Sequence, residues 1–90
     1  MPQYAPFKTW IPVQSSNLEA VWYDPAEEIL KVRFNPVDSH GQRGGVRSYA
    51  YSMVPPTVFL GLLDAGSKGQ YHAKHIKWNY PYVQLGYSDG

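Results

Sequence analysis

Two adjacent prolines, Pro55 and Pro56, separate two parts of this chain that have different hydrophobic periodicities. Before them, residues 29–34 alternate between apolar and charged positions, which is the period-two pattern of a strand. After them, residues 57–65 carry apolar side chains at helical spacing. Proline cannot donate to a sheet ladder, and it is favoured at the first position of a helix. The pair therefore ends a strand and begins a helix, which predicts an α+β fold.

The part before the prolines is predicted to contain three strands, at residues 18–23, 29–34 and 46–54. Asp24 followed by Pro25 is a common opening of a turn, so the first two strands form an antiparallel hairpin. A glycine-rich loop at residues 35–45 leads to the third strand. The result is a three-stranded antiparallel meander, whose apolar face must be covered.

Two short helices after the prolines are the candidates to cover that sheet, which gives the order β-β-β-α-α. The first helix is predicted at residues 57–65, with Gly66 as its left-handed terminus. The second runs over residues 68–77 and begins with a capping box formed by Ser67 and Gln70. The side chains of the second helix that are expected to face the core are Tyr71, His75 and Ile76.

The chain is short enough for one domain, predicted at residues 15–85, with a C-terminal tail at residues 86–90. Residues 1–14 combine three prolines with three aromatic side chains and are predicted to form an extended N-terminal arm. Ninety residues bury only a thin core, and the chain has no cysteine to cross-link it. Aromatic residues make up 16% of the chain, more than such a core can bury. We therefore expect a homo-oligomer, formed through residues 1–14 or through exposed aromatic side chains.

Several short motifs together resemble one known family. Tyr49-Ala50-Tyr51 followed by Val54-Pro55-Pro56 is similar to the central pattern of the KTSC domain family. The other matching motifs are Ser15-Ser16-Asn17, Tyr23-Asp24-Pro25, Ser67-Lys68-Gly69, Tyr71, His75-Ile76 and Tyr80-Pro81-Tyr82. KTSC domains occur at the C-terminus of some lysyl-tRNA synthetases and as short stand-alone proteins of bacteria and phages, and RNA binding has been suggested for them. The resemblance implies no catalytic residue.

Composition and motifs argue against several classes of protein. No apolar run approaches the roughly 20 residues that cross a bilayer, and the N-terminus lacks the order of a secretory signal. With no cysteine in the chain, we expect a cytoplasmic protein of a bacterial cell or a phage-infected host. No serine lies in a recognisable nucleophile turn. We therefore expect no catalysis, no cofactor and no bound metal.

The first candidate for a binding site is the third predicted strand. Arg47, Tyr49 and Tyr51 share one face of that strand, and two aromatic rings beside a guanidinium can stack on nucleobases. Each stacked base contributes about 1–3 kcal/mol in such sites. The alternative is that this face packs beneath the helices.

The second candidate is the start of the second helix, at Ser67, Lys68 and Gly69. Free backbone N–H groups and the helix dipole attract anions, and Lys68 adds a positive charge. Between Asp64 and Asp89 the chain has three lysines and no acidic residue. The alternative is a helix cap without a ligand.

The side chains of the second helix complete the predicted site. Lys74 and Lys77 are candidates to hold phosphates, with Tyr71 and His75 beside them. His72 and His75 could share a helix face and a metal, but no motif supplies further ligands. His75 is instead expected to make a buried or half-buried hydrogen bond with a tyrosine hydroxyl.

Three functions are compatible with these features. The first is a non-catalytic module that binds RNA or another phosphate-bearing ligand. The second is a phage or prophage protein that sequesters a nucleotide signal as a homo-oligomer. The third is a protein-interaction or structural module with Trp10, Trp78 and Tyr80 as anchors, because aromatic side chains dominate interface hot spots.

Overall fold

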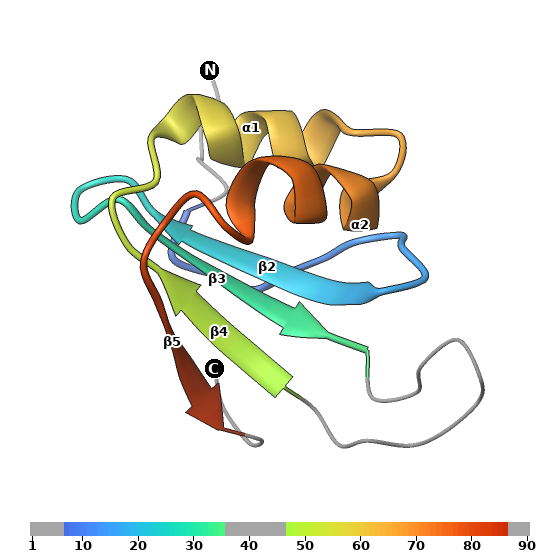
Figure 1. The fold of residues 1–90 in the computed structure, drawn as a ribbon, viewed down its shortest axis with the longest axis horizontal. Helices are drawn as coiled ribbons and strands as arrows, with labels where there is room; N and C mark the ends of the chain where they lie inside the picture. Colours follow the sequence, from blue (N-terminus) through green and yellow to red (C-terminus); the bar gives the residue numbers. More distant parts are fainter. Residues whose placement is uncertain (1–6, 36–46, 87–90) are drawn as a thin grey trace.

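The fold is one antiparallel sheet with helices on one of its faces, seen in a computed structural model that describes residues 7–35 and 47–86 (Figure 1). The predicted loop at residues 35–45 falls, apart from its first residue, outside the described ranges, as do residues 1–6 and 87–90. The elements in chain order are β1 (Ile11–Pro12), β2 (Leu18–Asp24), β3 (Ile29–Phe34), β4 (Arg47–Tyr51), α1 (Pro56–Asp64), α2 (Lys68–Tyr71), η1 (His72–Ile76) and β5 (Tyr82–Gly86).

The sheet has five strands in the order β1-β2-β3-β4-β5, and every neighbouring pair is antiparallel. The α+β class is confirmed, and β2, β3 and β4 form the predicted meander. The predicted number of strands is wrong, because an edge strand lies on each side of that meander. β1 has two residues, one of them a proline, and it lies in the segment predicted as an extended arm. A strand this short carries no alternation that a sequence pattern can detect.

One face of the sheet is apolar and supports the helices. Across β3 and β4, Leu30 lies opposite Tyr51 and Val32 lies opposite Tyr49, so these side chains share the helix-covered face. Tyr23 lies opposite Leu30 on the same face. Its ring stacks on Phe59 of α1, with centroids 4.7 Å apart. The Tyr23 hydroxyl also donates a buried 2.5 Å hydrogen bond to the Val54 carbonyl, so one side chain joins the sheet to α1.

The second helix differs from its prediction in its last turn and in the side chains that it buries. α2 continues without a break into η1, a π-helical turn in which the Lys77 N–H donates to the His72 carbonyl at 2.9 Å. His72 and Ile76 face the sheet and are buried, whereas His75 is exposed. The expectation that His75 faces the core is therefore wrong, and the burial of Ile76 is confirmed.

Helix ends agree with the sequence in part. Ser67 Oγ accepts the Gln70 N–H at 3.4 Å, which is the predicted cap of α2. α1 ends at Asp64 rather than at residue 65, and Ala65 already has extended backbone angles. Gly66 does not adopt the left-handed conformation predicted for it. The chain leaves α1 through extended backbone at Ala65, so no left-handed glycine is needed there.

The other face of the sheet carries its own cations over its tryptophans. Lys31 Nζ lies 4.2 Å from the centroid of the Trp22 ring, and the Arg33 guanidinium lies 4.2 Å from that of Trp10. Both tryptophans are half-buried. Long cationic side chains thus cover apolar surface that the helices leave open. No helix in the described parts of the chain is long and apolar enough to span a membrane.

Candidate ligand-binding surface

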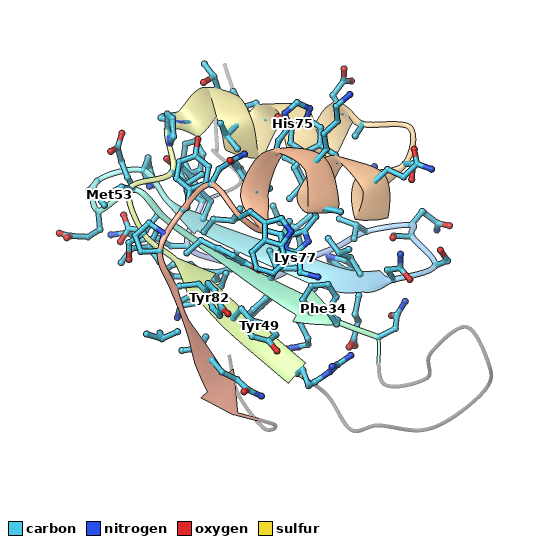
Figure 2. All side chains as sticks on the ribbon, in the orientation of Figure 1. Phe34, Tyr49, Met53, His75, Lys77 and Tyr82 are labelled. Carbon is cyan, nitrogen blue, oxygen red and sulfur yellow. The ribbon has the colours of Figure 1, made fainter. Side chains whose placement is uncertain are left out.

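Three aromatic side chains lie in a line on the helix-covered face of the sheet, next to η1. These are Phe34 of β3, Tyr49 of β4 and Tyr82 of β5, and we call them the aromatic row (Figure 2). The Phe34 and Tyr49 rings meet edge to face with centroids 5.8 Å apart, and those of Tyr49 and Tyr82 lie 5.7 Å apart. Phe34 and Tyr49 are half-buried, and Tyr82 is 51% exposed. The row therefore becomes more accessible towards the β5 edge.

A buried polar pair lies against the aromatic row. Tyr51 of β4 and His72 of η1 have 3% and 5% of their surface exposed, and the Tyr51 hydroxyl lies 2.8 Å from His72 Nε2. The imidazole also meets Phe34 edge to face, with centroids 5.2 Å apart. The pair links η1 to β4, and its imidazole packs against the Phe34 end of the row.

Both members of this pair are uncharged at neutral pH. Burial lowers the pKa of His72 from 6.5 to about 4, and the positive charge of Lys77 adds to this effect. Burial also raises the pKa of Tyr51 above its ordinary value, with smaller contributions from Tyr49 and Tyr82. A general acid or base works best when its pKa is near the working pH. The shifts move the pKa values of both groups further from pH 7, which favours a structural role for the pair.

Two cations lie near the row. Arg47 is exposed and lies directly opposite Phe34 in the register of β3 and β4. Lys77 is exposed at the end of η1, and Figure 2 shows it between that turn and the row. Its ammonium is 5.0 Å from the centroid of the Trp78 ring and close enough to His72 to lower that pKa. The row thus combines partly open rings with two positive charges.

The second predicted group, at the start of α2, is occupied by contacts within the protein. Ser67 caps the helix, and the Lys68 ammonium donates to the Ala65 carbonyl at 3.0 Å. A Cβ on Gly69 would lie 2.5 Å from Asn17 Nδ2, so this glycine allows the β1–β2 connection to approach α2. These three residues do not join the aromatic row.

Of the remaining predicted residues, Tyr71 packs between the second helix and α1 at the edge of the core, and His75 and Lys74 are exposed. Tyr71 donates to the Val58 carbonyl at 3.2 Å, and its ring contacts that of exposed His75 with centroids 4.6 Å apart. The expected hydrogen bond between a histidine and a tyrosine hydroxyl exists, but it is made by His72 rather than by His75. The two histidines lie on different sides of the helix, and the described residues contain no group of three or more metal-ligating side chains.

The structure therefore brings Tyr49, Tyr51, Arg47 and Lys77 together and leaves the other predicted residues elsewhere. Phe34 and Tyr82 belong to the same surface but were not among the candidates, and His72, which was considered only as a metal ligand, is buried beneath it. The inward position of Phe34 follows from the alternation of β3. Only the register between β3 and β4 was needed to place it beside Tyr49. Tyr82 could not be assigned to the row without β5, and His72 could not be assigned without knowing which face of the second helix packs on the sheet.

Comparisons with known sequences point to one family. The sequence profile of the KTSC domain family matches residues 14–80. A protein of Tsukamurella paurometabola is 47% identical over 74 residues, which span 82% of this chain and 97% of that protein. A protein of Stutzerimonas stutzeri is 38% identical over 67 residues, which span 74% of this chain and 82% of that protein.

A solved structure agrees with the fold as well. The crystal structure of a KTSC domain protein from Yersinia pestis superposes with a TM-score of 0.72 at 27% identity, covering 87% of this chain and 97% of that one. Together with the profile match, which extends over most of the chain, this assigns the family. The chain belongs to the KTSC domain family.

Proposed function

We propose that this KTSC domain is a non-catalytic module that binds single-stranded RNA on the aromatic row. The observation that carries the proposal is the half-exposed ring of Tyr82 beside Tyr49, with the cations Arg47 and Lys77 next to the row. Unstacked bases have two open faces and a flanking phosphate, so they need rings and positive charge at short spacing. Tyr82 offers the ring, and Arg47 and Lys77 offer the charges.

The geometry favours a strand of bases over a paired helix. Single-stranded segments can splay their bases onto aromatic side chains, whereas paired RNA presents mainly its backbone and a shallow groove. The row follows the strand-to-strand direction across β3, β4 and β5, so successive bases can reach successive rings. Tyr82 is the ring with the most open surface and is the expected position of the first stacked base.

A matched pair of variants on β5 tests the proposal. Tyr82 and Val83 are adjacent, have 51% and 61% of their surface exposed, and point to opposite faces of the sheet. Tyr82→Ala should weaken binding of a labelled single-stranded RNA of about ten nucleotides by roughly 5- to 150-fold, the value of one stacked base. Val83→Ala should leave the affinity within about twofold, because the lost methyl groups are on the other face. Equal effects of the two variants would contradict the proposal.

Charge gives a second, independent readout. Each phosphate held by the protein adds about 0.7 to the slope of log affinity against log salt for single strands. Lys77→Ala should therefore lower that slope by about 0.7, and Lys31→Ala, on the opposite face, should not change it. A ligand that binds equally well as a mononucleotide and as an oligonucleotide would favour sequestration of a free nucleotide over RNA binding.

A further inference from the structure

β5 is an edge strand that lacks the charge, the proline and the very short length that protect many such edges. The sheet order ends at β5, so one side of its backbone has no neighbouring strand among the described residues. Its sequence, Tyr-Val-Gln-Leu-Gly, has no charged residue and no proline. The opposite edge, β1, has only two residues and includes Pro12. Natural proteins blunt exposed edges with charge, proline, bulges or short length. The register shift of β5 lies beyond Gln84, where Gly86 pairs with Ser48, so the stretch from Tyr82 to Gln84 stays regular.

The register of β4 and β5 identifies the backbone groups on the free side. The Ser52 N–H donates to the Pro81 carbonyl at 2.9 Å, which makes these two residues a hydrogen-bonded pair. Tyr51 lies opposite Tyr82, and Ala50 lies opposite Val83. Hydrogen-bonded and non-hydrogen-bonded pairs alternate in an antiparallel ladder, so Val83 is bonded to β4. The N–H and C=O groups of Tyr82 and Gln84 therefore point away from β4.

We propose that β5 pairs with β5 of a second copy of this chain, antiparallel and about a two-fold axis at Val83. In that arrangement Tyr82 of each copy exchanges backbone hydrogen bonds with Gln84 of the other. Tyr82 and Gln84 lie one residue to either side of Val83. A two-fold rotation about Val83 therefore brings the outward N–H and C=O groups of Tyr82 opposite those of Gln84 in the other copy. A second copy is thus complementary to the edge without any rearrangement of the strand.

The exposed side chains of β5 gain from the same pairing. Tyr82 and Val83 are two of the five large apolar side chains with most exposure among the described residues. The two Val83 side chains would face each other on the face of the sheet that the helices do not cover. On the helix-covered face, the two aromatic rows would meet at the new interface. The dimer rests on the edge geometry alone and does not depend on RNA binding.

The size of the contact sets the expected strength. Two paired five-residue strands bury roughly half of the ~800 Å² per partner of a standard interface. A contact of that size corresponds to a weak, concentration-dependent dimer with a dissociation constant above about 1 μM. Self-association should therefore be measured over a wide range of concentrations and also trapped covalently.

The chain has no cysteine, which makes disulfide trapping a clean test. Opposed residues in a non-hydrogen-bonded antiparallel pair have Cα atoms about 4.5 Å apart, within the range of about 4.4–6.8 Å that a disulfide spans. Val83→Cys should form a covalent dimer under mild oxidation. Leu60→Cys, at a position on α1 that is 49% exposed, is the matched control and should form it at least tenfold more slowly.

Sedimentation equilibrium gives the reversible counterpart. Val83→Lys places two like charges on the axis and should weaken the dimer at least tenfold, with an unchanged circular dichroism spectrum. Three outcomes would overturn the proposal: a monomer up to about 1 mM, a dimer whose affinity Val83→Lys leaves unchanged, or equal cross-linking rates for the two cysteine variants. Val83→Lys retains Tyr82 and Lys77, so its monomer should still bind RNA. A variant that loses the dimer but keeps RNA binding therefore separates this proposal from the proposed function.

Discussion

The Tyr51 hydroxyl lies 2.8 Å from Nε2 of His72, and this bond joins β4 to the π-helical turn η1 in a site that solvent barely reaches. Both groups are uncharged at neutral pH, so the pair costs less to bury than an ion pair would. Next to it lie the rings of Phe34 and Tyr82. The hydrogen-bonded pair therefore packs directly against two of the three rings of the aromatic row.

Removing the hydroxyl of Tyr51 should destabilise the fold. Tyr51→Phe leaves the His72 nitrogen without its partner in a buried site, and such a group costs about 1–3 kcal/mol. Tyr71→Phe removes a longer, partly buried bond of 3.2 Å to the Val58 carbonyl and should cost less, about 0.5–1.5 kcal/mol. Urea unfolding of both variants measures the difference. A smaller loss for Tyr51→Phe than for Tyr71→Phe would contradict the role given to the pair.

The low pKa of His72 predicts that stability falls in mild acid. His72 has a pKa of 6.5 in the unfolded chain and about 4 in the fold. Between these values the unfolded chain binds a proton that the folded chain does not, so lowering the pH favours unfolding. The free energy of unfolding should drop by about 3 kcal/mol in total as the pH falls from 6.5 to 4.

The control for this pH dependence is His72→Gln. The glutamine does not titrate, so this variant should lose stability at pH 7 but should lack the His72 contribution between pH 6.5 and 4. Urea unfolding at a series of pH values compares the two proteins. The assignment fails if wild type and variant show the same slope in this window.

Two glycines differ in what an added methyl group would meet. A Cβ on Gly61 of α1 would collide with the Tyr71 hydroxyl and lie 2.9 Å from its ring carbon Cζ. Gly61→Ala should therefore destabilise the protein by about 1–3 kcal/mol, although alanine is the better helix former. A Cβ on Gly66 would meet nothing within 4 Å, so Gly66→Ala should be neutral or slightly stabilising. Thermal unfolding would contradict this account if Gly61→Ala were the more stable variant.

The turn between β2 and β3 contains a strained position. Glu28 has a φ of 57°, in the left-handed region that glycine adopts more easily. Asp24 Oδ1 accepts the N–H groups of Ala26 and Glu27 at 2.9 and 3.3 Å, which fixes the turn around it. Glu28→Gly should stabilise the protein by about 0.5–1 kcal/mol, and Glu27→Gly, at an ordinary backbone position, should destabilise it. Opposite signs in chemical denaturation are the expected result, and a loss of stability in both variants would count against the strain.

The fold was more predictable from sequence than the site, and particular residues show why. Leu30, Val32 and Phe34 alternate with charged side chains, so β3 and its buried face could be identified from the pattern alone. β1 could not, because a two-residue strand that contains a proline is stabilised by pairing with β2 rather than by its own sequence.

The site depended on two features that local patterns do not contain. His72 and Ile76 are buried together at i, i+4 spacing, so the helix faces the sheet through His72 rather than through His75, and which face turns inward was set by packing on the sheet. The aromatic row is formed by residues 34, 49 and 82, which come together only through the registers of β3, β4 and β5. Tyr49 could be predicted as a site residue from the alternation of its own strand. Tyr82 could be assigned to the site only once the pairing of β5 with β4 was known.

The most direct test of the proposed function is the affinity of the unmodified protein for single-stranded RNA at two salt concentrations. Fluorescence anisotropy with an oligonucleotide of about ten nucleotides should show binding at about 50 mM salt that weakens by roughly 5- to 20-fold at about 200 mM, as expected for two or three phosphate contacts. An affinity for duplex RNA that equals that for the single strand, or no binding at the lower salt concentration, would contradict the account.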